Sequence, residues 1–583
     1  MSIQFRTAAA RPIALAWRKL WPLLVLAFDW TLERFPIVGR ASARRRTRVV
    51  LAPYKRMYSL RKSILKVSSV PLVVFGCLLY GFFFGLTAPY LLVPFAVPIV
   101  ILAATIIWAL PEQRTAPTLA VEYLFTVHFA IVALWPRYLA ITLPGMPWIT
   151  LLRLFGLPMA ALFLVSLSTN RAFRKRIHES ASSLRPVWLC FCGFVFVQII
   201  TSVVSTSPVA SIQAVFDQQI YWTCIFLISC TLFRKPGTVE RYWALLCSVF
   251  VVLCVIGAVE SRVHHVLWAS HIPKILKVPD PSVQVTLTPE FRPGTNVYRA
   301  KAVFSTPLAF AEYISLLTPF WLHFGFSPIR PFLRGVCFAM IPITFIVVRM
   351  TDARLGLVGM LVCLLLYGAL WTIVRWRSNA RDLLAAAAVY AYPVLFMAGV
   401  GAILSSHRAK MMLLGGGAQA GSTEARNSQL GMAMSKIWTH PWGFGSGQSG
   451  NAMGFAKGDF ITIDNYFITL LLDYGLAGVI LWYGMFIAGI ATSVRYCVSR
   501  EYGQRPEAKL LAPLAVCLTA FLIVKWVHGQ SDNHSIFFMF LGMICALVYR
   551  LRHDPAPEVA KPAPKRRRAD GRASNRPQEA YTS

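Results

Sequence analysis

Charged residues, and acidic ones above all, are scarce in this sequence of 583 residues. Only 14% of the residues are charged, and 24 Asp and Glu stand against 58 Lys and Arg, whereas 56% of the residues are hydrophobic. A soluble domain of this size would need far more polar surface. The N-terminus shows no signal-peptide pattern, because the first long apolar run begins near residue 68, after a strongly basic stretch.

Cysteines are absent from the two longest polar loops. The chain has 12 cysteines, and all except Cys497 lie within apolar runs. A disulfide framework outside the membrane is therefore not expected. No Cys/His spacing resembles a zinc site, and neither a metal nor another cofactor is expected.

Long apolar runs are abundant, and their length decides the fold class. They extend over about 18–22 residues, which as a helix crosses about 30 Å of hydrocarbon. Membrane β-strands would instead alternate polar and apolar residues over about ten positions. The sequence predicts an all-α polytopic membrane protein with about fourteen spans. They are expected at residues 68–86, 89–110, 118–135, 149–168, 187–205, 214–233, 242–259, 304–325, 332–348, 354–374, 382–403, 464–490, 510–527 and 535–549.

The distribution of basic residues predicts the topology. Lys and Arg cluster in both tails and in every second short loop, as cytoplasmic segments do in the bacterial inner membrane. The net charge of +34 therefore does not indicate nucleic-acid binding. We expect a basic cytoplasmic segment over residues 1–67 with an amphipathic helix on the membrane surface, a transmembrane domain over 68–549, and a disordered basic cytoplasmic tail over 550–583.

Two outer loops are long, at about 260–303 and 404–463, and loops of this length commonly carry function. The region 136–153 is interrupted by three prolines and an arginine, and two structures are open for it, a re-entrant or interfacial segment and a spanning one.

Polar side chains gather at the outer ends of spans, where hydrophobicity does not explain them. Arg299 precedes a span that contains Glu312, and Arg354 follows Asp352 between two spans. Arginine is costly to embed unless it is paired or faces water, so Arg354 either pairs with Asp352 or serves a ligand. Arginines that converge with Arg426 of the long loop would form a diphosphate site, because guanidinium groups bind phosphate oxygens bidentately.

Asp464 lies where the long outer loop enters a span. Burial raises the pKa of a carboxyl group and nearby arginines lower it, so a balanced carboxylate could accept a proton from a sugar hydroxyl. The alternative is structural, since an aspartate before an apolar helical run is a good helix cap.

A glycine-rich stretch in the same loop contains His440, Gly443 and Gly445, and its glycines permit tight turns and close backbone approach. It lacks the terminal Gly-Lys-Ser/Thr of a phosphate-binding loop. The last outer loop carries His528, Asp532 and His534, which are candidates for lining the same cavity.

Residues 295–490 resemble the bacterial O-antigen ligase and polysaccharide polymerase family. Residues 299–313 are similar to its Arg, Phe, Pro pattern ahead of a span. Residues 351–356 (Thr-Asp-Ala-Arg-Leu-Gly) occupy the place of its Ser-Arg-x-Gly motif. Residues 426–430 fit Arg-x-x-x-Leu, and residues 437–445 are similar to its His-Pro-x-x-Gly-x-Gly segment.

The fourth motif is the most specific one. Ligases of this family carry His-Asn, nine residues, and then Gly-x-x-Gly. Here Asp464-Asn465 is followed by nine residues and then by Gly475 and Gly478, so the spacing agrees and aspartate replaces histidine. The Asp-Asn form is more similar to exopolysaccharide polymerases.

The resemblance implies a GT-C-like membrane glycosyltransferase that inverts the anomeric centre without a metal. Its substrate would be an undecaprenyl-diphosphate-linked oligosaccharide at the periplasmic face, and the product would be exopolysaccharide or O-antigen-type polymer. Arg299, Arg354 and Arg426 would bind the diphosphate, and Asp464 would be the base. Membrane lipids and polysaccharide chain-length or export proteins are the expected partners. The alternatives are ligase-type transfer of a finished glycan to lipid or protein, and, in another class, a glycolipid flippase.

The topology can be tested by cysteine labelling. Cysteines introduced near residues 280 and 440 should react with a membrane-impermeant maleimide in intact cells, because both positions are expected outside. The unsubstituted chain is the control for its own cysteines. Labelling only after the membrane is permeabilised would contradict the predicted orientation.

Overall fold

The computed structural model describes residues 71, 74–83, 98–113, 115–142, 148–292, 296–379, 381–407, 420–454 and 463–555. The chain divides into two units, Met1–Phe83 and Phe84–Ser583, which are considered separately. The first contains a described helix over Val74–Phe83. The expected surface helix within 1–67, and the expected tail beyond residue 555, lie outside the described residues.

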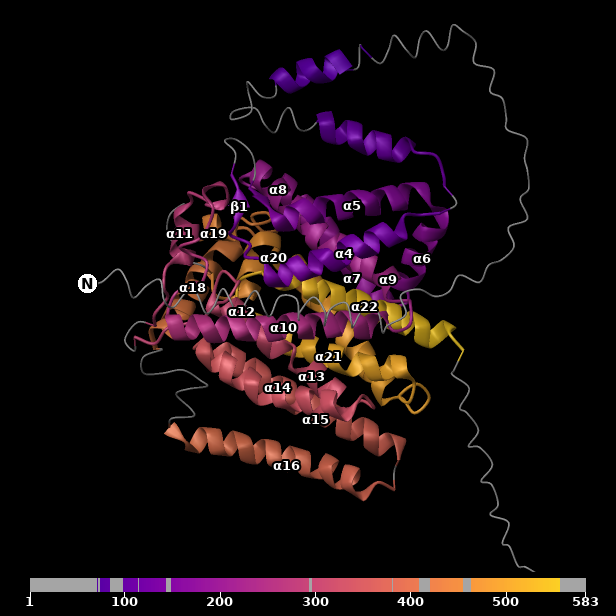
Figure 1. The fold of residues 1–583 in the computed structure, drawn as a ribbon, viewed down its shortest axis with the longest axis vertical. Helices are drawn as coiled ribbons and strands as arrows, with labels where there is room; N and C mark the ends of the chain where they lie inside the picture. Colours follow the sequence, from indigo (N-terminus) through magenta and orange to yellow (C-terminus); the bar gives the residue numbers. More distant parts are fainter. Residues whose placement is uncertain are drawn as a thin grey trace, which may run out of the picture. The chain divides into compact units, whose positions relative to one another are not determined.

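The second unit is built almost entirely of helices (Figure 1). Among the residues that the structure describes, nine helices are long and apolar enough to cross a membrane: α5 (Leu151–Thr169), α7 (Arg185–Val203), α10 (Thr238–Val263), α14 (Pro331–Met350), α15 (Arg354–Ser378), α16 (Leu383–Ser405), α20 (Tyr466–Val498), α21 (Pro506–Lys525) and α22 (His534–His553). A shorter apolar helix at Pro98–Ala109 and α4 (Thr118–Leu134) precede them. The all-α polytopic class is confirmed, and the count of about fourteen spans stays a prediction.

Two predicted spans are interrupted helices rather than continuous ones. The predicted span 214–233 consists of α8 (Pro208–Gln218), a π-helical turn η1 (Gln219–Cys224) and α9 (Ile225–Leu232). The predicted span 304–325 consists of α12 (Pro307–Leu316) and α13 (Thr318–Phe326). The second break follows from Pro319, which has no backbone N–H to continue the α-helical hydrogen bonds.

Loop regions carry the remaining elements. A basic helix α6 (Arg171–Ser182) joins α5 to α7. The outer loop 260–303 contains a 3₁₀ turn η2 (Lys274–Leu276) and α11 (Pro281–Leu287), and the outer loop 404–463 contains α18 (Ala420–Thr439) and α19 (Ser449–Ala452). Within the region 136–153, β1 (Ala140–Ile141) pairs antiparallel with β2 (Ile149–Thr150), with Ala140 opposite Thr150. The Thr150 side chain then caps α5.

Burial distinguishes the centre of this unit from its edge. Of the most apolar 18-residue stretch in each helix, 94% is buried in α22 and only 6% in α16. Helix α22 packs against α9 and α21, and α20 packs against α7 and α21. Helix α16 lies at the edge beside α15 (Figure 1). Its exposed apolar side chains, such as Leu384 and Val394, are those expected of a helix that faces lipid.

Helix α20 is broken at Gly475, and this break shapes the region of the candidate site. Gly475 has φ +65°, and a Cβ atom there would lie 2.1 Å from the carbonyl oxygen of Pro441. The glycine-rich loop therefore packs directly on the helix. Its Phe444 and Gly445 N–H groups donate to the Leu472 and Asp473 carbonyl oxygens, over 2.7 and 3.0 Å. Only glycine satisfies both the left-handed backbone and this close approach.

We predict that Gly475→Ala markedly lowers the midpoint of thermal unfolding of the purified protein. The left-handed conformation disfavours alanine by about 1–2 kcal/mol, and the added methyl group collides with the Pro441 carbonyl. Gly450→Ala in the packed loop is the matched control, because a Cβ at Gly450 meets nothing within 4 Å. Equal midpoints for the two variants would mean that the break is not a structural requirement.

Candidate functional site

Arg299 is held in a rigid part of the first long outer loop. Phe291 and Tyr298 form an antiparallel bridge, and the Arg299 N–H donates to the Glu290 carbonyl oxygen over 2.9 Å. The Arg299 guanidinium also contacts the Glu290 carboxylate at 2.5 Å. Burial lowers the pKa of Arg299 below its ordinary value, and Glu290 opposes this effect. The guanidinium remains charged, since arginine is not deprotonated in proteins.

Glu260, in the last turn of α10, fixes the backbone that follows Arg299. Its carboxylate accepts hydrogen bonds from the Tyr298 hydroxyl at 2.8 Å, the Ala302 N–H at 2.6 Å and the Lys301 N–H at 3.2 Å. Ala302 adopts φ +48°, a conformation that is uncommon for alanine. These bonds therefore stabilise a strained segment directly beside Arg299.

Asp352 is paired with an arginine that the sequence did not point to. It lies in the turn between α14 and α15, where its carboxylate forms an ion pair with Arg292, and the Arg292 guanidinium also donates to the Asp352 carbonyl oxygen at 2.6 Å. The alternative in which Asp352 pairs with Arg354 is thus wrong. Arg354 begins α15 and forms no ion pair or hydrogen bond with any residue that the structure describes. Its charge interacts electrostatically with those of Arg292, Arg426 and Asp352.

Asp464 is close to Arg426, and it is not the helix cap. Helix α18 carries Arg426, whose Nε lies 3.8 Å from Asp464 Oδ2, with both side chains about 30% exposed. Helix α20 is capped by Asn465, whose side chain accepts a hydrogen bond from the Phe467 N–H at 2.9 Å. Gln429 fixes the backbone by accepting from the Asp464 N–H at 3.1 Å. The capping alternative therefore applies to Asn465, and it does not account for Asp464.

Arg299 and Asp464 line one small cavity of about 180 Å³, although 165 positions separate them in the chain. Glu290, Arg299 and residues 306–308 form one wall, Ile463 and Asp464 a second, and residues 527–530 of the last outer loop a third. The second and third walls are in contact. Gly529 packs so closely on Ile463 that an added Cβ atom would lie 1.9 Å from the Ile463 carbonyl oxygen. The cavity thus depends on segments from three distant parts of the sequence.

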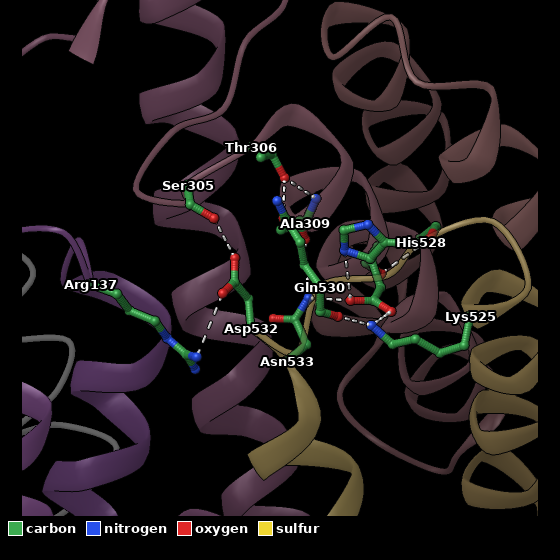
Figure 2. A network of polar contacts seen from close by, with 11 residues as sticks. Arg137, Ser305, Thr306, Ala309, Lys525, His528, Gln530, Asp532 and Asn533 are labelled. Carbon is green, nitrogen blue, oxygen red and sulfur yellow. Dashed lines mark hydrogen bonds and ion pairs between the residues drawn. The ribbon is translucent and has the colours of Figure 1, made fainter. Parts of the chain in front are cut away.

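A buried ion pair lies beneath this cavity. Glu312 of α12 is fully buried and contacts the Lys525 ammonium, also fully buried, at 2.9 Å. The Asn533 amide donates to the same carboxylate at 2.8 Å and to the Ala309 carbonyl oxygen at 3.1 Å. Figure 2 shows the Lys525 side chain from the end of α21 reaching into this network. Glu312 therefore joins α12 to the end of α21 and to the start of α22.

The last outer loop meets the first cavity wall through further polar contacts (Figure 2). Asp532 accepts a hydrogen bond from the Ser305 hydroxyl at 2.6 Å and lies 3.7 Å from Arg137. Thr306 donates to the Gln530 side chain at 2.7 Å. These contacts hold residues 305–306 in place at the rim of the cavity.

Of the three residues expected from the last outer loop, His528 lines the cavity. Its Nε2 lies 3.7 Å from the Glu312 carboxylate, and burial holds the pKa of His528 well below its ordinary value, so its imidazole is neutral. Asp532 is used in the contacts with Ser305 and Arg137 instead. His534 is buried among aromatic rings, including those of Trp222 and Tyr466.

The glycine-rich loop is positioned by Asp473, which the sequence analysis missed. The buried Asp473 carboxylate accepts hydrogen bonds from the N–H groups of Ser449 at 2.7 Å and Gly447 at 3.0 Å. A Cβ on Gly443 would lie 2.5 Å from the Asp473 carbonyl oxygen. His440 is exposed at the start of this loop and does not line the cavity. The sequence feature that could have identified Asp473 is the presence of an acidic residue within a long apolar run.

The structure places some of the predicted site residues close to one another and others farther apart. Arg299 and Asp464 share a cavity, Arg426 pairs with Asp464, and Arg354 lies within electrostatic range of Arg426. Of the predicted loop-shaping residues, Gly443, Gly445, Gly475 and Gly478 lie around the break in α20, and Asn465 caps the start of this helix. Arg292 and Glu260 were missed, because their roles depend on partners far away in sequence.

These features define a multi-pass helical membrane protein with a cluster of arginines and a partly exposed carboxylate, that of Asp464, at one end of its helices. Residues 338–483 match the sequence profile of a family described as O-antigen ligase. The match confirms the resemblance to the O-antigen ligase and polymerase family over these residues, which include Asp352, Arg354, Arg426 and Asp464. That family implies a glycosyltransferase-like activity with lipid-linked glycans as substrates. Among curated proteins, none matches the chain significantly.

Proposed function

We propose that the protein is a polysaccharide polymerase of the bacterial inner membrane, with its site at the periplasmic face. It transfers a glycan from an undecaprenyl-diphosphate carrier onto a sugar hydroxyl of an incoming lipid-linked repeat unit. The observation that carries the proposal is that Asp464 and Arg299 line one cavity, with Arg426 beside the Asp464 carboxylate.

The arginines are suited to the leaving group. A departing lipid diphosphate carries several negative charges, and guanidinium groups that are already in place stabilise that charge as it develops. Arg354 is the best candidate for direct contact, since it forms no ion pair or hydrogen bond with a described residue. Because side chains supply the positive charge, the mechanism requires no metal.

Asp464 is suited to activating the acceptor. Its carboxylate would take the proton of the attacking hydroxyl while the hydroxyl oxygen forms its bond to the anomeric carbon. The bond between that carbon and the diphosphate oxygen breaks, and undecaprenyl diphosphate leaves with the bonding electrons. Attack from the side opposite the leaving group inverts the anomeric centre.

Two alternatives have different support. Ligase-type transfer of a finished glycan is favoured by the description of the matching family as O-antigen ligase. Ligase-type transfer uses the same donor chemistry as polymerisation and differs from it only in the acceptor. A flippase would place polar groups near the membrane midplane on broken helices. The arginines and Asp464 lie at helix ends and in outer loops, which favours chemistry at one face.

The diphosphate assignment predicts that Arg354→Lys and Arg426→Lys each reduce polymer formation by about 10²-fold at normal protein levels, because lysine keeps the charge and loses the bidentate geometry. Arg262→Lys, at the outer end of α10, is the matched control and should leave polymer unchanged. The measurement is polymer per cell, normalised to membrane-inserted protein. Full activity of both site variants would indicate structural roles instead.

The base assignment predicts that Asp464→Asn makes about 10²–10⁴-fold less polymer, because asparagine cannot accept the proton. Lipid-linked repeat units should accumulate and be detected by mass spectrometry of lipid extracts. The fold should persist, since Asn465 provides the helix cap. Asp464→His should recover part of the activity, because histidine is also a competent base.

The control for folding is Asn465→Ala, which removes the cap and should lower thermal stability by about 1 kcal/mol. Asp464→Asn should show no such loss. A near-wild-type rate in Asp464→Asn would exclude Asp464 as the base and direct attention to His528, which lines the same cavity.

A further inference from the structure

A second pocket lies at the opposite end of the 33-residue helix α20 from Asp464. Its volume is about 780 Å³, larger than that of the candidate active-site cavity. It is formed by the start of α7, the last turns of α20, the loop that follows α20 and the end of α22. On the topology predicted above, this end faces the cytoplasm.

Three arginines line this pocket, and two of them lack partners. Arg552 is fixed by hydrogen bonds that it donates to the Tyr496 hydroxyl at 2.7 Å and the Ser183 carbonyl oxygen at 2.6 Å. Arg185 and Arg495 are exposed and form no ion pair or hydrogen bond with the described residues. A pair of uncommitted guanidinium groups beside a fixed one is an arrangement that binds an anion.

The remaining lining is polar and carries little negative charge. Glu501 is the one carboxylate among the described lining residues, and it interacts with the adjacent Tyr502 hydroxyl. Three arginines against one glutamate leave a lining charge of +2. Hydroxyl groups of Ser182 and Thr492 also line the pocket and can donate to phosphate or glycerol oxygens.

An apolar track leads from Arg185 along α7. Leu189 is 67% exposed and Phe196 63% exposed, and Cys192 between them is also exposed. Positions four, seven and eleven residues after Arg185 fall on the same face of a helix. An acyl chain could therefore lie along α7 while its headgroup occupies the pocket. A soluble anion has no acyl chain and would not contact these apolar side chains of α7.

We infer that this pocket binds the headgroup of an anionic glycerophospholipid, with the phosphate held by Arg185, Arg495 and Arg552 and an acyl chain on the exposed face of α7. Basic pockets between membrane helices on the cytoplasmic side recognise such headgroups. The inference does not depend on the proposed glycosyltransferase function, since no part of the pocket contacts the candidate active site.

The test is native mass spectrometry of the purified full-length protein, titrated with dioleoyl phosphatidylglycerol or dioleoyl phosphatidylcholine. We expect a tight first phosphatidylglycerol adduct and no equivalent phosphatidylcholine adduct. The double variant Arg185→Gln/Arg495→Gln should raise the dissociation constant of that adduct by about tenfold or more. Arg171→Gln/Arg381→Gln, which removes the same charge elsewhere on this face, should leave it within about twofold.

Three results would overturn the inference. They are equal affinity of the double variant and the wild type, equal adducts with both lipids, and displacement of phosphatidylglycerol by millimolar inorganic phosphate, which would indicate a soluble ligand. Gel filtration and thermal unfolding establish that the variants are folded. If the double variant is unstable, the single Arg185→Gln and Arg495→Gln variants must each weaken the adduct, and unchanged affinity in both would equally overturn it.

Discussion

The buried ion pair between Glu312 and Lys525 is the interaction on which the candidate site depends. It joins α12 to the end of α21, and Asn533 extends it to the start of α22. Two charges without solvent are tolerated only when each has close partners, so removing one would leave the other unpaired and strongly destabilise the region. Two cavity-lining residues lie next to this pair: His528 Nε2 is 3.7 Å from the Glu312 carboxylate, and Lys525 donates to the Gln530 carbonyl oxygen at 2.5 Å.

Beside that ion pair, the site combines an arginine that is held in a fixed position with a carboxylate that remains accessible. Arg299 is largely buried and held by Glu290, which fixes its position without removing its charge. Asp464 is partly exposed and close to Arg426, where it remains accessible to a hydroxyl. In the proposed reaction, this arrangement would place positive charge where the diphosphate leaves and a carboxylate where the proton is released. The lipid carrier would stay in the membrane while the sugar chemistry takes place at the helix ends.

The membrane class was predictable, because apolar runs long enough to span a bilayer have few alternative structures. Asp464, Arg354 and Arg426 were predicted as site residues from motif spacing, which reflects local chain geometry. The pairing of Arg292 with Asp352, the cap at Asn465 and the break at Gly475 were not found. Each of these features depends on a segment that is distant in the sequence and packs against it in the fold. At the break in α20, for example, the Pro441 carbonyl oxygen lies so close to Gly475 that no side chain fits there.

The most direct test of the account is an assay with purified protein and undecaprenyl-diphosphate-linked repeat units in lipid nanodiscs, analysed by mass spectrometry. The account predicts lipid-linked oligomers of increasing length, one undecaprenyl diphosphate released for each linkage formed, and an inverted anomeric configuration in each new bond. Repeat units that remain unchanged in the presence of folded protein would contradict it.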